Sequence, residues 1–515
     1  MITLKSYLRG EWVEGQGDKA TLVNPTTGEA VAEAGTGGID FGPAVALART
    51  EGGPALRAMT FAERGAMLKA LSKAIHAARE SLIEESILNG GTTRGDAKFD
   101  IDGASATLAY YARLGKQLGD AKTLAEATEP LTDSARFYGR HVWTPLRGVA
   151  VHINAFNFPA WGLAEKAAVA LLAGMPVISK PATSTALLSV RVVEAMLGAD
   201  VLPHGTFQLV TGSAGNLLSH LGSQDVMAFT GSADTGTKLR SLPNLLASST
   251  RVNVEADSLN STVLTEEVDD DTYQRFLTDA ATEITQKAGQ KCTATRRIFV
   301  PTSMIDRVTE DLGERLGRVV VGDPAKKEVR MGPLATKQQL DDFRAGIETL
   351  EAAGARVVWG SKGAPDLHEA DANKGFFVSP VLLRADAPGE AAAVHQHEVF
   401  GPCSTLLPYE TPEQAAEWVA LGGGSLVASV YGDDRGVLEA LVLALAPFSG
   451  RVLMVSKKVA GQSISPGLVL PSCVHGGPGR AGGGEELGGE RGLRFYMQRC
   501  AVQGDRGLLD KFFGK

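Results

Sequence analysis

Cysteine is scarce in this chain, and its few thiols are not spaced for cross-links or metal binding. The 515 residues contain four cysteines, Cys292, Cys403, Cys473 and Cys500, with no C-x-x-C pair and no dense disulfide framework. The nine histidines include no H-E-x-x-H or comparable pair of ligands. The sequence therefore predicts reduced thiols, a cytoplasmic location and no metal site.

Long apolar stretches and an excess of basic charge are also missing. The N-terminal residues have no apolar core of signal-peptide length. The longest apolar run, 167–178, contains Gly174 and Pro176 and is shorter than the ~20 residues that a membrane-spanning helix needs. With 51 basic and 59 acidic residues, the net charge of −8 gives no electrostatic footprint for nucleic acid. We therefore expect a protein that binds neither membranes nor nucleic acid.

Strands and helices alternate through the middle of the chain. Strands are predicted over 148–153, 176–180, 206–210, 226–230 and 251–255, with helices over 160–172, 184–197 and 234–239. This spacing is typical of an α/β fold with a parallel, doubly wound sheet, in which ligands bind at the carboxyl ends of the strands. Five polar or glycine positions follow predicted strands: Asn157, Lys180, Gly212, Ser232 and Glu255. We expect a ligand site at this edge of the sheet.

The flanking segments are less regular. A second α/β region is predicted over about 256–470, although residues 410–460 give no clear element pattern. Residues 476–489 contain eight glycines and are predicted to be loop. The segments 134–143 and 495–502 both have the aromatic, alternating pattern of strands, and they could pair with each other.

Cys292 is the candidate nucleophile, in the sequence Gly289-Gln290-Lys291-Cys292-Thr293. A thiol attacks as the thiolate, and the adjacent Lys291 is expected to lower its pKa. Taken alone, a single cysteine is more often a small buried apolar residue. Two glycine-rich stretches are set aside: Gly477–Gly482 fits G-x-G-x-x-G but contains Pro478, and Gly231–Lys238 lacks the G-K-[ST] of a phosphate loop.

Four stretches in order resemble the aldehyde dehydrogenase superfamily. They are Asn154-Ala155-Phe156-Asn157-Phe158-Pro159, Phe229-Thr230-Gly231-Ser232, Gly289-Gln290-Lys291-Cys292 and Glu398-Val399-Phe400-Gly401-Pro402. The glycine-rich run that begins at His475 further resembles CoA-linked semialdehyde dehydrogenases of aerobic aromatic degradation. The resemblance implies the aldehyde dehydrogenase fold, with doubly wound parallel sheets in a cofactor-binding and a catalytic domain and a β-ribbon oligomerisation arm. It assigns residues 1–130 and 148–255 to the NAD(P)-binding domain, 256–489 to the catalytic domain, and 131–147 and 490–515 to the ribbon of a homodimer.

The resemblance also implies catalytic roles. Cys292 would add to the aldehyde, and the Asn157 amide and the Cys292 backbone N–H would stabilise the oxyanion. Glu255 would be the general base, with its pKa raised by partial burial. The usual Glu-Leu-Gly-Gly is Glu255-Ala256-Asp257-Ser258 here, so the carboxylate is kept while the backbone path differs. Lys166 and Glu486 match a proton-relaying pair, for which a structural salt bridge is the alternative.

The remaining matched positions concern the cofactor. The resemblance places Lys180 and Thr183 at the adenosine ribose, and the neutral Thr183 in place of a glutamate favours NADP over NAD. The other implied cofactor-binding residues are Gly212, Thr230, Gly231, Ser232, Glu398 and Phe400. Ser232 and Gly231 would meet the pyrophosphate at a helix N-terminus.

The expected activity is NADP-dependent oxidation of an aldehyde to a carboxylate, with a CoA-linked aldehyde as substrate. One alternative is a CoA-acylating aldehyde dehydrogenase, which the presence of Glu255 disfavours. A second is a nicotinamide-independent cysteine acyltransferase or hydrolase, which would need a histidine base, and no histidine lies near Cys292 in sequence. A third, a non-catalytic structural protein, is disfavoured because Cys292, Glu255 and Asn157 are all present.

Overall fold

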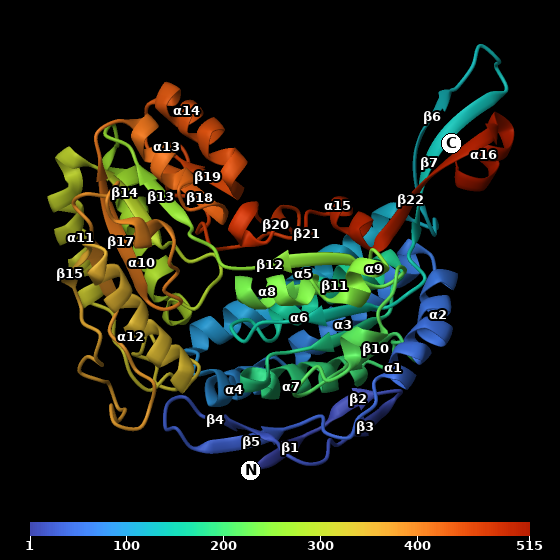
Figure 1. Cartoon of the computed structure of the whole chain (residues 1–515), viewed down its shortest axis with the longest axis horizontal. Coiled ribbons are helices and arrows are strands. Elements are labelled where there is room, and N and C mark those ends of the chain that lie inside the picture. Colours follow the sequence, from blue (N-terminus) through green and yellow to red (C-terminus); the bar gives the residue numbers. More distant parts are fainter. Residues whose placement is uncertain (515) are drawn as a thin grey trace.

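Two seven-stranded sheets and a three-stranded ribbon form the framework of the computed structural model, which describes residues 1–514 (Figure 1). The first sheet has the order β12-β11-β8-β9-β10-β2-β3. Its parallel strands are β8 (Ala150–Ile153), β9 (Val177–Lys180), β10 (Phe207–Leu209), β11 (Val226–Thr230) and β12 (Arg251–Glu255). The antiparallel strands β2 (Ser6–Leu8) and β3 (Glu11–Val13) extend one edge. The predicted doubly wound α/β sheet is confirmed.

Helices cover the first sheet and form the largest core. The helix α6 (Trp161–Ala173) follows β8 and is buried along nearly its whole length, because its sequence is apolar on every face except for Glu165 and Lys166. It packs against α5 (Arg94–Leu118) and α3 (Phe61–Ala77), whose first turn is fixed by a capping box between Thr60 and Glu63. The remaining helices of this part are α1 (Gly42–Leu47), α2 (Gly53–Ala58), α4 (Arg79–Gly90), α7 (Ala186–Leu197), α8 (Ala233–Arg240) and α9 (Pro243–Ala247). A small separate sheet contains β1 (Ile2–Leu4), β5 (Ala30–Ala34) and β4 (Ala20–Val23).

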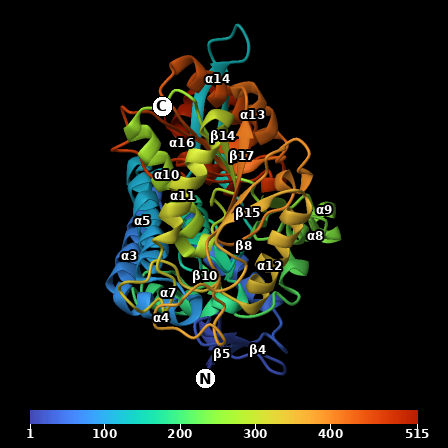
Figure 2. The ribbon, with the colours of Figure 1, turned by 90° about the vertical axis from the view of Figure 1, so that its left-hand side faces the viewer.

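The second sheet has the order β15-β16-β17-β14-β13-β18-β19 and is parallel except at β15. Its strands are β13 (Ser261–Leu264), β14 (Arg297–Pro301), β15 (Arg356–Trp359), β16 (Val381–Arg384), β17 (Cys403–Tyr409), β18 (Ser425–Tyr431) and β19 (Ser449–Val455). Viewed from the side of this sheet, α10 (Asp270–Thr285) and α11 (Ile305–Gly317) face the viewer (Figure 2). The helix α12 (Lys337–Ala352) completes the part of the chain before β15.

Residues 410–460, which gave no clear pattern in sequence, fold as a regular strand–helix alternation. The helix α13 (Pro412–Ala420) connects β17 to β18, and α14 (Arg435–Leu445) connects β18 to β19. The glycines at 422–424 form the turn between α13 and β18, and two of them have positive φ.

The ribbon confirms the predicted pairing of the two distant segments. The strand β22 (Met497–Asp505) pairs antiparallel with β7 (Phe137–Pro145), and β6 (Leu124–Pro130) pairs with the other edge of β7. The ribbon therefore begins before the expected boundary at residue 131. It projects away from the two sheets together with α16 (Arg506–Phe513) (Figure 1).

The glycine-rich segment is not a simple loop. Its ends form an antiparallel pair, β20 (Val474–Gly476) with β21 (Glu485–Leu487), followed by the short helix α15 (Glu490–Leu493). Leu487, Leu493 and Tyr496 pack into the core of the first sheet. The hairpin therefore leaves the second sheet and docks on the first, and lies between them in Figure 1. Among the described residues, no helix combines the length and apolarity that crossing a membrane requires.

Candidate active site

An open cleft lies at the carboxyl ends of the strands of the first sheet. Four of the five residues expected at this edge line it, namely Asn157, Lys180, Ser232 and Glu255. Thr183, Thr230, Gly231, Glu398, Phe400 and Cys292 line the same cleft. A second, small cavity shares Asn157, Glu255 and Cys292 with it and is also lined by Trp161, Lys166 and His475. The thiol therefore lies where two cavities meet.

Gly212 does not line either cavity, so its expected role in cofactor binding is not supported. It follows β10, one strand farther from the cleft than β9. Its φ of +115° requires glycine, and a Cβ here would lie 3.1 Å from the backbone of Gly35. Gly212 therefore permits a turn that packs against the N-terminal segment.

The turn before Cys292 has an unusual backbone. Lys287, Ala288 and Gly289 all have left-handed φ values of 54°, 52° and 66°. A Cβ on Gly289 would lie 2.1 Å from the carbonyl oxygen of Gly401, so only glycine fits. Non-glycine residues in this conformation cost about 1–3 kcal/mol each, so surrounding contacts must hold the turn.

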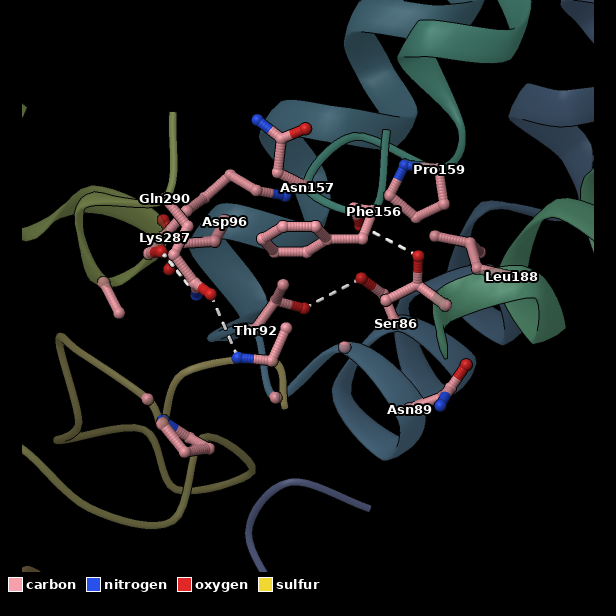
Figure 3. Close-up of a pocket in the computed structure, with 17 residues that line it drawn as sticks. Ser86, Asn89, Thr92, Asp96, Phe156, Asn157, Pro159, Leu188, Lys287 and Gln290 are labelled. Carbon is pink, nitrogen blue, oxygen red and sulfur yellow. Dashed lines mark hydrogen bonds between the residues drawn. The ribbon is translucent and has the colours of Figure 1, made fainter. Parts of the chain in front are cut away.

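Residues around a small cavity beside the turn provide those contacts (Figure 3). The Lys287 ammonium lies over the Phe158 ring at 4.4 Å, and the buried carboxylates of Asp96 and Asp100 attract it. Gln290 donates to the Lys287 carbonyl at 3.2 Å and accepts from the Ala335 N–H at 3.1 Å. In Figure 3 Lys287, Gln290 and Asp96 lie together beside Asn157, so one cluster supports both the cysteine turn and the asparagine loop.

Lys291 does not supply the charge that the sequence suggested. Its Nζ lies 2.8 Å from Glu283 Oε2 and 2.9 Å from Gln286 Oε1, and its side chain is fully buried. Burial instead raises the pKa of the Cys292 thiol well above its ordinary value, and the charge of Glu255 raises it further. The expectation that the neighbouring lysine activates Cys292 is therefore wrong.

The buried Lys291–Glu283 pair is expected to be structural. Replacing Glu283 by glutamine leaves a buried ammonium unpaired, and should destabilise the protein by about 3–5 kcal/mol. The double variant Glu283→Leu with Lys291→Met removes both charges and should lose less stability than Glu283→Gln alone. Thermal unfolding midpoints of the three proteins measure this, and a double variant that unfolds lowest of all would contradict the assignment.

His475 is the functional candidate that sequence reasoning missed. Its Nε2 lies 3.8 Å from Cys292 Sγ and 3.2 Å from Glu255 Oε1. The ring is only 4% exposed, and Glu255 is 2% exposed. His475 stands 183 residues after Cys292 and opens a segment that was predicted to be loop, so separation along the chain hid the contact. The one available signal was its place at the start of the run that carried the closer resemblance.

The contact with His475 reverses the expected titration of Glu255. Burial raises the pKa of this carboxyl, but the charge and hydrogen bond of His475, together with Lys166, lower it to about 2. Burial lowers the pKa of His475, but the charge of Glu255 raises it above its ordinary value. The Glu255 carboxylate therefore makes the His475 ring a stronger proton acceptor than a buried imidazole would be without it.

Lys166 and Glu486 form the ion pair that the resemblance implied. Lys166 Nζ lies 3.1 Å from Glu486 Oε2 and 3.1 Å from Glu165 Oε1. Burial raises the pKa of Glu486 to about 7, and Asn253 donates to its other oxygen at 3.0 Å. Carboxylate oxygens of Glu165, Glu255 and Glu486 lie within 4.8 Å of one another, so a chain of titratable groups leads away from the thiol.

At the opposite end of the cleft, Lys180 and Thr183 stand at the end of β9 and just after it. Burial alone lowers the pKa of Lys180, and no carboxylate of residues 1–514 pairs with its ammonium. Ser232 caps α8, accepting from the Thr235 N–H at 3.4 Å. Glu398 accepts from the Ser258 N–H at 3.0 Å and pairs with Arg296 at 3.2 Å, and Phe400 packs edge-on against Phe156.

Comparison with known proteins identifies similar sequences and structures. The family model described as the aldehyde dehydrogenase family matches residues 12–502. The chain is 44% identical to 3,4-dehydroadipyl-CoA semialdehyde dehydrogenase from Aromatoleum evansii, over 93% of each chain. Similar solved structures include PnpE in complex with nicotinamide adenine dinucleotide (25% identity, TM-score 0.83, 97% of each chain). They also include an NADP-dependent enzyme from E. coli (25% identity, TM-score 0.84, 98% of each chain).

Proposed function

This chain belongs to the aldehyde dehydrogenase family, and we propose that it oxidises an aldehyde to a carboxylate through an acyl group on Cys292, with NADP as the acceptor. The observation that carries the proposal is the meeting of Cys292, Asn157 and Glu255 at the junction of two cavities. One cavity contains the polar side chains of Lys180, Thr183 and Ser232, which suit a cofactor, and the other contains the apolar side chains of Phe158, Trp161 and Val469, which suit a substrate chain.

The first step is the attack of the Cys292 thiolate on the aldehyde carbon, which gives a tetrahedral oxyanion bonded to Sγ. Donors placed in advance stabilise such an oxyanion by roughly 2.7–4 kcal/mol each. The buried Asn157 amide lines both cavities beside the thiol and is the side-chain donor. The Cys292 backbone N–H is the second donor. A nicotinamide bound in the cleft supplies the hydride acceptor, and the product on the enzyme is a thioester of Cys292.

The thioester must then be hydrolysed to release the acid. The Glu255 carboxylate and the Cys292 sulfur lie within 4.8 Å of each other, which leaves the carboxylate beside the acyl carbon. Glu255 is the proton acceptor for the attacking water, and the buried chain through Glu486 and Lys166 carries the proton away. A carboxylate in this place supports hydrolysis over transfer of the acyl group to free CoA.

The residues at the adenosine end of the cleft fit NADP. An ammonium with no carboxylate partner, that of Lys180, is free to pair with a 2′-phosphate, and the neighbouring Thr183 is a neutral hydroxyl. The pyrophosphate would meet the N-terminus of α8 and its cap, Ser232. The solved structures above include both an NAD complex and an NADP-dependent enzyme, so the fold is compatible with either cofactor.

Replacing Thr183 by glutamate is expected to reverse the cofactor preference. The new carboxylate would repel the 2′-phosphate, and like charges placed together cost several kcal/mol. We expect the KM for NADP to rise about tenfold or more, with a smaller change for NAD. Steady-state reduction of each cofactor measures this, with Thr183→Gln as the neutral control of similar size. A Thr183→Glu enzyme that keeps its NADP KM would remove the cofactor assignment.

For the substrate, we propose a CoA-linked semialdehyde such as 3,4-dehydroadipyl-CoA semialdehyde, the compound named in the relative from Aromatoleum evansii. The test is formation of reduced nicotinamide from a CoA-linked semialdehyde and from a free aldehyde of equal chain length, without added CoA. Faster turnover of the CoA-linked compound supports the proposal. Turnover that starts only after free CoA is added would favour a CoA-acylating enzyme instead.

A second candidate function has one observation in its favour. The contact between Cys292 and His475 is the pairing that a nicotinamide-independent cysteine hydrolase or acyltransferase would use. Release of acid from a thioester without any nicotinamide, at a rate equal to aldehyde oxidation, would support this reading.

We also propose that the ribbon joins two copies of the chain in a homodimer. Its edge strand β22 presents exposed side chains from Gln498 to Ala501, and its outer edge is not paired by another strand of residues 1–514.

A further inference from the structure

We propose that His475 is a catalytic residue, which takes the thiol proton of Cys292 and holds the sulfur as thiolate, while Glu255 holds the resulting imidazolium. The inference rests on the proposed role of Cys292 as nucleophile. In the step, the S–H bond breaks and an N–H bond forms at Nε2. The thiol becomes a thiolate and the neutral ring becomes an imidazolium, so charge and protons balance without any further reagent.

The geometry places one nitrogen between two partners. His475 Nε2 is 3.8 Å from Cys292 Sγ and 3.2 Å from Glu255 Oε1, so an unprotonated Nε2 can accept the thiol proton, and the charge that the ring then carries lies beside the carboxylate. All three groups are held from different elements: Glu255 ends β12, Cys292 follows the strained turn, and His475 is the middle residue of β20. Three separate elements of the fold therefore place these side chains around the thiol proton.

The surrounding charges explain why the thiolate needs this cation. The carboxylates of Glu255, Glu165 and Glu398 all act on Cys292 in the direction that disfavours the thiolate. Lys166 is held by Glu165 and Glu486, and Lys291 by Glu283. Arg451 also faces the site, but one of its nitrogens donates to the Leu468 carbonyl at 2.9 Å, and burial lowers its pKa. Among these cations, the His475 ring is the one within contact distance of the sulfur.

The ring nitrogens of His475 have different contacts from those of a structural histidine in the same chain. The buried His395 uses both ring nitrogens for fixed contacts, Nδ1 with Arg297 at 2.9 Å and Nε2 with the Pro388 carbonyl at 3.0 Å. The Nδ1 of His475 is buried and has no hydrogen-bond partner among the described residues. Its polar contacts in the described residues are therefore at Nε2, with Cys292 and Glu255, and no contact at Nδ1 fixes which nitrogen carries the proton.

Strand pairing and close backbone contacts fix the position of the hairpin that carries His475. His475 pairs directly with Glu486 in the register of β20 and β21. Gly476 has φ of +141°, and a Cβ on it would lie 2.1 Å from the Gly484 carbonyl oxygen. The glycines of this segment thus permit a close backbone approach that sets the imidazole beside the thiol.

The test is site-resolved alkylation of the cofactor-free protein by iodoacetamide across pH, with peptides quantified by mass spectrometry. Only the thiolate reacts, so the pH at which the Cys292 rate rises reports thiolate formation. We expect His475→Gln to move that rise upward by at least about one pH unit, and to slow Cys292 alkylation about tenfold at neutral pH. The exposed Cys473 and Cys500 are internal controls in the same sample, and their rates should not change. His204→Gln, at an exposed site, is the matched control variant.

Coincident Cys292 profiles in wild type and His475→Gln would overturn the proposal. The alkylation uses no aldehyde and no nicotinamide, so it stands or fails separately from the dehydrogenase assignment. A second readout separates chemistry from structure. If His475 acts on the proton, kcat/KM of His475→Gln falls at neutral pH and recovers as the pH rises toward that of the free thiol. Equal loss at every pH, with unchanged NADP binding and melting, would mean that the ring only shapes the pocket.

Discussion

Replacing Cys292 by alanine is expected to lower kcat for aldehyde oxidation by about 10⁴- to 10⁶-fold, because it removes the atom that becomes acylated. The residual rate would come from binding and from the Asn157 donor, which cannot form the covalent intermediate. Reduced-nicotinamide formation measures the rate, and intact-protein mass spectrometry after a pulse of substrate should find the acyl adduct in wild type only.

The chain provides its own controls for this variant. Cys473 is exposed and lines neither cavity, and Cys473→Ala should keep full activity. Cys292→Ala should bind NADP and melt as wild type does, because Cys292 lines the two cavities and belongs to no apolar core cluster. An alanine variant that retains more than roughly a tenth of the wild-type rate would contradict the nucleophile assignment, since losses in comparable enzymes are far larger.

The elements around the cofactor cleft could be predicted from sequence because their signals are local. Alternating apolar strands and helices gave β11 and β12 with the bounds that the structure has, and β8, β9 and α6 to within a few residues. Since parallel strands end at the same edge of a sheet, residues after β8, β9, β11 and β12 had to gather there. The ribbon pair, β7 with β22, was visible for the same reason: both segments have strong period-two patterns.

The pKa shift of the Cys292 thiol could not be predicted, because the side chains of adjacent residues can point away from each other. Lys291 directly precedes Cys292, but its side chain points to Glu283 on α10. The His475 ring, which does contact the sulfur, lies on a hairpin 183 residues later. The burial that raises the pKa of Cys292, and the ion pair that lowers that of Glu255, both depend on the packing of the hairpin between the two sheets.

Gly212 illustrates the limit of counting strand ends. It follows a strand of the same sheet, as Lys180 and Ser232 do, but β10 lies on the far side of β9 from the cleft. Strand order, which a single sequence does not reveal, decides which loops meet at a ligand. Gly212 has a positive φ and packs against Gly35, and it does not line the cleft.

Replacing Glu255 by glutamine is expected to separate the two halves of the reaction. The charge of Glu255 raises the pKa of Cys292 but also stabilises the His475 imidazolium, so its removal has two opposing effects on thiolate formation. The first turnover should therefore persist and give a burst of reduced nicotinamide equal to the enzyme concentration. Hydrolysis of the thioester loses its proton acceptor, and steady-state kcat should fall about 10²- to 10⁴-fold. Rapid-mixing kinetics measure both phases, with the exposed Glu267→Gln as control.

The same variant distinguishes hydrolysis from transfer to CoA. In a hydrolytic enzyme, the acyl group trapped on Cys292 of Glu255→Gln should be released by an added nucleophile such as hydroxylamine, because the thioester remains reactive while water is no longer activated. In a CoA-acylating enzyme, Glu255 would not limit deacylation, and the variant would turn over at the wild-type rate whenever free CoA is present. A variant with neither a burst nor steady-state turnover, although folded and able to bind NADP, would instead place Glu255 before the acyl-enzyme. In that case the carboxylate would act chiefly through the charge that it presents to His475.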